Sequence, residues 1–347
     1  MKIVICSMGY SGYSTSCWRA LADMSGVELV VYTPETDYPY HEDILAGLNV
    51  KVLDAAMFTN VRGVCDRFVA EMPDVVTIGG WSSPAFKALA YDVRLRGVRK
   101  LMAIDSTWTG SARQVLARWA LRGFVRRLDG VIVAGERGRQ FARWIGFRNN
   151  QIFTSTYGYD ATIFNPVLEK RLAFFKWPCQ FCFVGRYVPV KGLDTLLAAY
   201  QAYRRRVAVP WELHCFGKGP IAVEGEGVVD HGFIQPKALP EALMEQGVFV
   251  FPSRHEPWGV ALAEAAGAGL PLICSDAVAS GIDLVRDHYN GIVFPAGNVD
   301  RLVDALVWTH EHYDDLPQMG ERSQTYAGAY TPEVWATRWL DACSRRT

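Results

Sequence analysis

The sequence contains no apolar run close to the roughly 18 residues that a bilayer-spanning helix needs, so we expect any membrane contact to be peripheral. It also lacks low-complexity tracts, while 50% of its residues are hydrophobic and 21% are charged, which excludes an intrinsically disordered chain. The apolar run at residues 2–6 is brief and is followed by no small-residue cleavage site. We interpret this run as a buried strand and not as a signal peptide.

The cysteines do not form a zinc-binding pattern. Cys179 and Cys182 make a single Cys-x2-Cys, and the other six cysteines are scattered and supply no second pair. Most of them lie in apolar strand or helix patterns, which suits reduced thiols and predicts a cytoplasmic protein. We expect neither a metal nor another cofactor.

Short β-branched runs alternate with amphipathic helical stretches, a pattern typical of parallel sheets covered by helices on both faces. A length of 347 residues suits two domains of about 150 residues each. The expected strands are 2–7, 27–32, 50–53, 75–79, 101–105 and 131–134, followed by 181–185, 211–217, 248–252, 271–275 and 291–294. The sequence therefore predicts an α/β fold of two Rossmann-like, doubly wound domains in tandem.

Glycine and proline mark a linker between the two series of strands, from about residue 155. We expect domains at 1–170 and 171–330, followed by a docked C-terminal helix within 331–347. Thr331 suits the N-cap of this helix and Pro332 its first position.

Two cations converge at the end of the first strand of the second domain. Arg186 follows Gly185 at the carboxyl end of that strand, and Lys191 precedes a helix expected over 193–205. A helix N-terminus attracts anions, so this arrangement indicates a phosphate-binding site. The alternative is a surface Arg and Lys that flank an ordinary turn.

A second motif follows the strand at 248–252. Glu256 precedes a proline, which favours an extended backbone and leaves the carboxylate free to point into a cleft. We expect a helix to begin near residues 257–258, with Glu264 about 9 Å along its axis and in need of a polar partner such as a ribose diol. Unpaired first-turn amides can bind phosphate oxygens, and they belong to Gly259, Val260 and Ala261.

The two motifs together resemble those of retaining GT-B glycosyltransferases in the family called GT4. These motifs are Gly-Arg-x4-Lys-Gly over 185–192 and Glu-x7-Glu formed by Glu256 and Glu264, and the resemblance covers nearly the whole second half. It implies two Rossmann-like domains that face each other across a cleft, with the C-terminal helix docking back toward the first domain. It also implies transfer of a sugar from a UDP- or GDP-linked donor to a saccharide or lipid-linked acceptor, which the first domain binds.

The resemblance also implies roles for individual residues. Arg186 and Lys191 would bind the donor diphosphate, Glu256 the hydroxyls of the transferred sugar, and Glu264 the ribose. The base would lie near Phe233 and Ile234.

The first domain matches the family less closely. Gly12 belongs to a glycine-containing turn that could let the backbone approach phosphate or acceptor, although a structural turn explains it as well. Many members of the family carry a histidine after the strand equivalent to 101–105, where it meets the donor sugar. This sequence has Asp105 there, which we take as the substitute.

Two features that the sequence lacks bear on the expected mechanism. The sequence contains no Asp-x-Asp, the usual magnesium clamp of the other glycosyltransferase fold, so we expect catalysis without a metal. The family resemblance implies retention of the anomeric configuration. Because the sequence offers no obvious protein nucleophile, we expect a front-face displacement. A nucleotide-sugar epimerase and a non-catalytic nucleotide-sugar-binding protein are the alternatives.

The positive charge is unevenly distributed. Thirteen Lys or Arg residues lie between Arg94 and Arg148, against three acidic residues. Five of the arginines are expected on one amphipathic helix over 113–127. This helix indicates either a solvated face with extended arginine side chains or a peripheral contact with an anionic membrane, at the inner face of the cytoplasmic membrane. Nucleic acid is not expected as a partner, because no recognition motif accompanies the charges.

Overall fold

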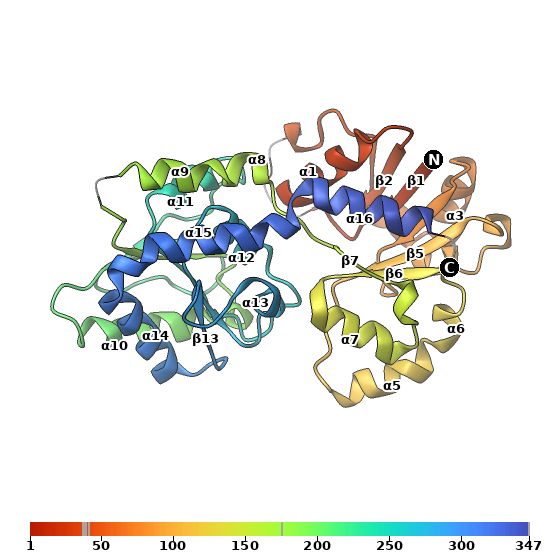
Figure 1. The fold of residues 1–347 in the computed structure, drawn as a ribbon. Coiled ribbons are helices and arrows are strands. Elements are labelled where there is room, and N and C mark those ends of the chain that lie inside the picture. Colours follow the sequence, from red (N-terminus) through yellow and green to blue (C-terminus); the bar gives the residue numbers. More distant parts are fainter. Residues whose placement is uncertain (37–39, 41, 175, 346–347) are drawn as a thin grey trace. The chain divides into compact units, whose positions relative to one another are not determined.

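The computed structural model describes residues 1–36, 40, 42–174 and 176–345 (Figure 1). The chain divides into two compact units: unit 1 comprises Met1–Gly158 with Tyr330–Thr347, and unit 2 comprises Tyr159–Ala329. Each unit has its own parallel β-sheet with helices packed against it. The prediction of two Rossmann-like α/β domains is confirmed.

Unit 1 is built around a seven-stranded sheet in the order β3-β2-β1-β4-β5-β6-β7. Its strands are β1 (Lys2–Cys6), β2 (Glu28–Pro34), β3 (Val50–Leu53), β4 (Val75–Ile78), β5 (Arg99–Ile104), β6 (Gly130–Val133) and β7 (Ile152–Thr154). Sequence patterning missed β7, because its three residues are too short a run to show a period. The order reverses between β1 and β4, and in open α/β sheets ligands bind beyond the carboxyl ends of the strands at such a point.

The helices of unit 1 come from both ends of the chain. They are α1 (Gly12–Ala22), α2 (Ala55–Thr59), α3 (Val61–Ala70), α4 (Pro84–Leu89), α5 (Ala112–Ala120), α6 (Arg122–Val125), α7 (Gly135–Ile145) and α16 (Pro332–Ser344), with short 3-10 turns η1 (Glu42–Leu45), η2 (Val93–Leu95) and η3 (Asn149–Gln151). The turn η6 (Gly328–Tyr330) spans the point where the chain returns to unit 1.

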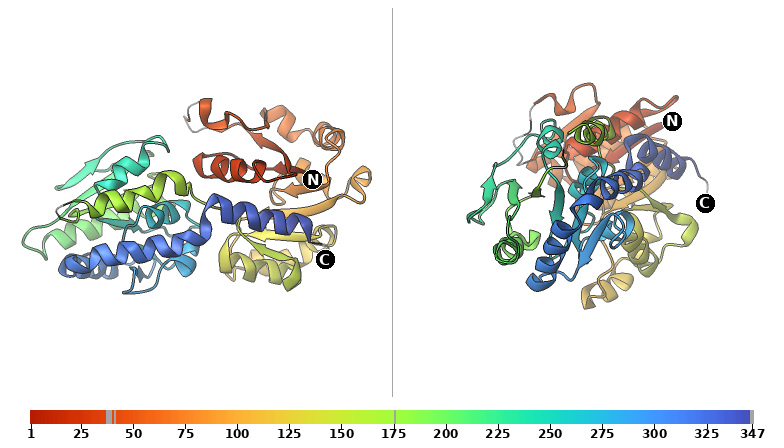
Figure 2. Two further views of the ribbon diagram at one scale, coloured as in Figure 1. Left: turned by 45° about the horizontal axis from the view of Figure 1, so that its top comes forward. Right: turned by 60° about the vertical axis from the view of Figure 1, so that its left-hand side comes forward.

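The C-terminal helix α16 packs along α1, as Figures 1 and 2 show. The Thr331 hydroxyl accepts a hydrogen bond from the Val334 amide at 3.4 Å, and Pro332 occupies the first turn, as predicted. Trp335 and Trp339 are buried in the core of unit 1. The expectation of a docked C-terminal helix is confirmed, although the last two residues of the chain lie outside the described residues.

The prediction of a single basic helix over 113–127 is wrong. The structure has two helices, α5 and α6, that meet at Leu121. Leu121 and Phe124 are buried, whereas α5 contains no buried residue. The chain therefore turns at Leu121 to bring α6 onto the core and leaves α5 on the surface.

Unit 2 contains a six-stranded parallel sheet in the order β10-β9-β8-β11-β12-β13. Its strands are β8 (Gln180–Val184), β9 (Glu212–Phe216), β10 (Val228–Asp230), β11 (Val248–Phe251), β12 (Leu272–Ser275) and β13 (Gly291–Phe294). The edge strand β10 was not predicted, because it is short and half-buried and lacks an apolar run. Here the order reverses between β8 and β11.

Eight α-helices are described in unit 2. They are α8 (Ala161–Phe164), α9 (Pro166–Leu172), α10 (Leu193–Arg204), α11 (Leu239–Met244), α12 (Val260–Gly267), α13 (Ala279–Leu284), α14 (Val299–Glu311) and α15 (Leu316–Ala327), with 3-10 turns η4 (Pro189–Lys191) and η5 (Tyr313–Asp315). No helix within the described ranges is both long and apolar enough to span a bilayer.

The stretch expected as a linker carries α8 and α9, and both pack on unit 2. Arg171 of α9 is almost completely buried, and its guanidinium donates to the carbonyls of Leu243, Ala268 and Gly269 at 2.7–2.9 Å. Burial lowers the pKa of this guanidinium to about 10. Because these bonds tie α9 to unit 2, the chain leaves unit 1 after Gly158, ahead of the boundary expected near residue 170.

Candidate active site

The charged residues singled out in the second half lie where the sheet of unit 2 reverses its order. Arg186 follows the carboxyl end of β8, and Glu256 lies in the loop after β11, the strand that pairs with β8. The two motifs are about 70 residues apart in sequence, but parallel pairing brings the ends of their strands together. The topology therefore gathers both motifs at the carboxyl ends of two central strands. We call this group of Arg186, Lys191 and Glu256 the charged edge of unit 2.

A glycine brings Lys191 to Glu256. Gly192 has a φ of +68°, and a Cβ atom at this position would lie 2.1 Å from the carbonyl oxygen of Pro252. Only glycine allows this close approach of the turn to the end of β11. The Lys191 ammonium forms an ion pair with the Glu256 carboxylate and lies 5.5 Å from the centre of the Phe251 ring.

Arg186 differs from Lys191 in that none of the described residues pairs with its side chain. Its side chain is exposed, and no hydrogen bond or ion pair engages it within the described part of the chain. The backbone before it is fixed, because the Gly185 amide donates to the Phe216 carbonyl at 3.0 Å. The guanidinium is therefore available to an anionic ligand.

Arg254 is a positioning residue that sequence reasoning missed. Its guanidinium donates to the Pro189 carbonyl at 2.8 Å, to the Asp194 carboxylate at 2.6 Å and to the Thr195 hydroxyl at 2.8 Å. These bonds join the loop that carries Glu256 to the turn that carries Lys191. The sequence signal was a third cation, two residues before Glu256.

Helix α12 begins at Val260, later than the expected start at residues 257–258. Residues 256–258 stay outside the helix, and the Glu256 and Trp258 carbonyls accept from the amides of Ala279 and Ser280. Gly259, with a φ of +96°, is the N-cap. Three backbone amides at the start of the helix donate no hydrogen bond to any of the described residues. They are those of Gly259, Val260 and Ala261.

Glu264 is partly buried on α12 and has no hydrogen-bond partner within the described residues. Burial raises the pKa of this carboxyl group to about 7, and the nearby negative charge of Asp160 adds to the shift. A carboxyl group in this state gains from a ligand that donates hydrogen bonds to its ionised form.

Phe233 and Ile234 follow β10 and are partly buried. The turn before them is fixed, since the Gly232 carbonyl accepts from the Gly217 amide at 2.8 Å. The Lys218 ammonium lies 5.5 Å from the centre of the Phe233 ring, a contact that sequence reasoning missed. An apolar ring and a cation thus lie together beside the edge strand.

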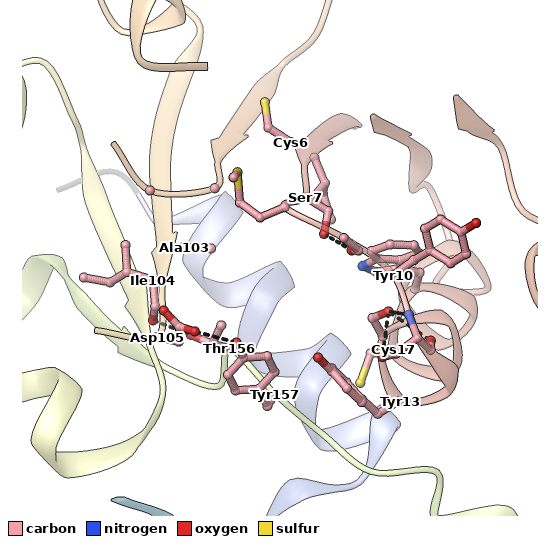
Figure 3. Close-up of a pocket in the computed structure, with 18 of the residues that line it drawn as sticks. Cys6, Ser7, Tyr10, Tyr13, Cys17, Ala103, Ile104, Asp105, Thr156 and Tyr157 are labelled. Carbon is pink, nitrogen blue, oxygen red and sulfur yellow. Dashed lines mark hydrogen bonds between the residues drawn. The ribbon is translucent and has the colours of Figure 1, made fainter. Parts of the chain in front are cut away.

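Unit 1 has a pocket of about 830 Å³ beyond the carboxyl ends of β1, β4 and β5 (Figure 3). Gly79, which follows β4, is needed here, because a Cβ atom would lie 2.5 Å from the Cys6 carbonyl oxygen. Gly12 begins α1 but is not among the residues that line the pocket. Aromatic side chains form much of the lining, namely Tyr10, Tyr13, Trp18, Tyr40, Trp81 and Tyr157.

Asp105 lies at the end of β5 on the wall of this pocket. It is exposed, and one carboxylate oxygen accepts a hydrogen bond from the Tyr157 hydroxyl at 3.1 Å. The other oxygen has no partner within the described residues. Figure 3 shows the ring of Tyr157 next to that of Tyr13, with the centres 5.6 Å apart and the rings edge to face.

Helix α16 supports the segment that carries Tyr157. Trp335 and Trp339 both line the pocket, and their indoles stack with centres 4.4 Å apart. The indole N–H groups donate to the backbone carbonyls of Thr156 and Ser155 at 3.1 and 2.6 Å. The last helix of the chain therefore fixes one wall of the pocket.

Two protein-family models match the chain. Residues 178–312 match the model described as "Glycosyl transferases group 1", and residues 9–158 match "Glycosyl transferase 4-like domain". The first match contains the charged edge of unit 2, and the second contains most of the residues that line the pocket of unit 1.

Several curated proteins with similar sequences are sugar transferases. A GDP-mannose-dependent alpha-(1-6)-phosphatidylinositol monomannoside mannosyltransferase of Mycobacterium tuberculosis is 28% identical over 288 residues, covering 76% of this chain and 74% of the relative. The O-antigen chain mannosyltransferase B of Escherichia coli is 30% identical over 149 residues, covering 40% of this chain and 38% of the relative.

Solved structures extend the likeness to the whole fold. HepE of Anabaena, solved in complex with UDP and glucose, superposes with a TM-score of 0.75 over 98% of both chains. Its sequence is 15% identical, so this likeness concerns the fold alone.

Proposed function

Since the chain is a glycosyltransferase with the GT-B fold, we propose that it transfers a hexose, with retention of configuration as in family GT4, from a nucleotide-diphosphate sugar to a saccharide or lipid-linked acceptor. The observation that carries the proposal is the charged edge of unit 2, where the Lys191–Glu256 pair lies at the same strand ends as the unpaired Arg186. GDP-mannose is the favoured donor, because the relative that covers three quarters of the chain is GDP-mannose-dependent. A UDP-sugar is the alternative.

In this proposal unit 2 binds the donor. Arg186, Lys191 and the unpaired amides at the start of α12 take the diphosphate oxygens. The Glu264 carboxylate takes the ribose hydroxyls, and the base lies beside Phe233 and Ile234. Glu256 accepts hydroxyls of the transferred sugar and keeps its contact with Lys191.

The chemistry requires stabilisation of a leaving group. When the bond from the anomeric carbon to the phosphate oxygen breaks, its electron pair stays on the diphosphate, and the two cations stabilise that charge. The acceptor oxygen attacks from the same face, and its proton passes to the departing phosphate oxygen. The cations take the place of a metal ion, so we propose that the reaction runs in EDTA.

The pocket of unit 1 is the proposed acceptor site. Aromatic faces pack against the C–H faces of sugar rings, and a carboxylate accepts hydrogen bonds from their hydroxyls. Asp105 was expected at the donor sugar, but because it lies on the wall of this pocket with one oxygen available, we assign it to the acceptor, with Tyr157 orienting the group. We place the reaction in the cytoplasm at the inner face of the membrane, where lipid-linked acceptors are available.

The direct test is calorimetric titration of GDP, UDP and ADP into the protein in EDTA, with Glu264→Ala and the exposed helical Glu321→Ala as matched variants. We expect one nucleotide to bind strongly to the wild type and to Glu321→Ala, and about tenfold or more weakly to Glu264→Ala. Failure of all three nucleotides to bind would overturn the donor site.

Turnover separates the alternatives. A transferase releases nucleoside diphosphate from the sugar donor in step with glycosylated acceptor, and the anomeric configuration of the product is read by NMR. An epimerase changes the donor without releasing the nucleotide, and a binding protein leaves it unchanged. Either of these outcomes, or an inverted product, would contradict the proposal.

A further inference from the structure

Helix α5 exposes an apolar face on the surface of unit 1. Figure 1 shows α5 beside α7, on the side away from the sheet. Val115, Leu116 and Trp119 share one side of the helix and are 41%, 66% and 69% exposed. No other helix of more than eight residues in the described part of the chain lacks buried residues altogether.

The inner side of α5 is well fixed, so its exposed side is a defined surface. The Gln114 side chain accepts from the Thr109 amide and donates to the Thr107 carbonyl, at 2.7 and 2.5 Å. The indole N–H of Trp144 donates to the Gln114 carbonyl at 3.0 Å. Leu116 and Trp119 are thus held outward by a structured helix.

Positive charge surrounds this face without compensation. The segment 112–128 contains five arginines and no acidic residue. The five are Arg113, Arg118, Arg122, Arg126 and Arg127. All of them are exposed, and none forms an ion pair with a described residue. Arg94 on the same unit, in contrast, pairs with Asp66 and Asp92 at 2.6 and 2.7 Å.

We infer that the α5–α6 surface, residues 112–127, docks onto an anionic phospholipid bilayer. Aliphatic and indole side chains flanked by arginines suit the boundary between headgroups and acyl chains, where the guanidinium groups meet lipid phosphates. A polyanion such as RNA would satisfy the arginines but leave Leu116 and Trp119 in water. The charge and the apolar face together therefore favour lipid.

The surface also adjoins the pocket of unit 1. Arg113, the first arginine of α5, lines that pocket. If the pocket is the acceptor site of the proposed function, docking presents it to acceptors whose anchor lies in the bilayer. The docking itself does not depend on that assignment, because it rests on α5 and α6 alone.

The test is co-sedimentation of the full-length protein with vesicles of phosphatidylglycerol or of phosphatidylcholine. Leu116→Ser/Trp119→Ser removes the apolar face, and Arg122→Glu/Arg126→Glu reverses part of the charge. Matched controls on unit 2 are the exposed Val209→Ser and Arg205→Glu. Nucleotide titration of every variant separates folding and donor binding from docking.

We expect binding to the anionic vesicles that weakens with salt, and little binding to the neutral ones. Each double variant should bind about tenfold more weakly or worse, since one arginine near an anionic surface contributes about a factor of five. The controls should bind as the wild type does. Binding that ignores lipid charge, binding that both double variants retain, or preference for RNA over vesicles would overturn the inference, even where nucleotide binding is intact.

Discussion

The two units share one topology but carry different chemistry at equivalent places. Both sheets reverse their order beside the first strand of the unit, between β1 and β4 in unit 1 and between β8 and β11 in unit 2. The edge of unit 2 carries Arg186, Lys191 and Glu256, whereas the pocket of unit 1 is lined mostly by aromatic and small polar side chains. The fold supplies the position of a site, and the loops after the strands decide which ligand it takes.

The two units also differ in how each would bind its ligand, by charge in unit 2 and by apolar surface in unit 1. A diphosphate requires cations and free amides, while a sugar requires flat apolar faces with a few hydrogen-bond acceptors. Substitutions in one unit should therefore change the kinetics of one substrate and leave the other unchanged.

The largest expected effect comes from Lys191→Met. Removal of the ammonium group takes away stabilisation of the departing diphosphate and leaves the Glu256 carboxylate without its cation. We expect kcat to fall by about 10²–10³-fold, measured as release of nucleoside diphosphate. The control is Lys170→Met, an exposed lysine of α9. An unchanged kcat would show that the charged edge does not serve the chemistry.

Asp105→Asn should act on the other substrate. Loss of the charge weakens hydrogen bonds from sugar hydroxyls, so we expect KM for the acceptor to rise about tenfold or more, with unchanged affinity for the nucleotide. Asp23→Asn, at the exposed end of α1, is the matched control. A rise in the donor KM instead would assign Asp105 to the donor sugar and contradict the division of the two substrates between the units.

The raised pKa of Glu264 predicts a pH dependence confined to unit 2. With a folded pKa of about 7 against the ordinary 4.5, the carboxyl group keeps a proton that the unfolded chain has lost, so stability should fall as pH rises from about 5 to 7. Ribose hydroxyls prefer the carboxylate, so nucleotide affinity should rise about tenfold between pH 6 and 8. Calorimetry on Glu264→Gln should lose both trends, and persistence of both would contradict the assignment.

The smallest expected effect is a loss of stability from removing one indole hydrogen bond in each unit. Trp339→Phe in unit 1 and Trp177→Phe in unit 2 each remove an indole N–H that donates to a backbone carbonyl, at 2.6 and 2.9 Å. Each should cost about 1 kcal/mol of unfolding free energy. Bound nucleotide stabilises only the unit that binds it. In thermal unfolding, saturating nucleotide should therefore compensate the loss of stability in Trp177→Phe but not the loss in Trp339→Phe.

The sequence predicted the parts of the fold that leave a strong local pattern. The strands of both sheets were located to within one or two residues, except β7 and β10, whose three residues each carry no period. The break at Leu121 was also missed, because helical spacing continues through it, and only the buried positions of Leu121 and Phe124 require a turn.

Chain order was enough to predict which charged residues lie together, while their roles stay predictions. Lys191 and Glu256 form an ion pair, and parallel pairing of β8 with β11 is enough to expect their proximity. Arg254 and Lys218 escaped notice, since their contacts depend on side-chain directions within loops. The aromatic pocket was likewise not predicted, because its lining comes from distant segments, including Trp335 and Trp339 of α16.

The return of α16 to unit 1 has a consequence for the order in which the protein is made. Unit 2 is one uninterrupted stretch, so a ribosome can release it complete while synthesis continues. Unit 1, although synthesised first, lacks a wall of its core until Trp335 and Trp339 emerge. The apolar side of α1 that α16 covers stays exposed until α16 is synthesised, which happens after the whole of unit 2. The unit whose sheet is synthesised before the other is therefore the one whose core is completed later.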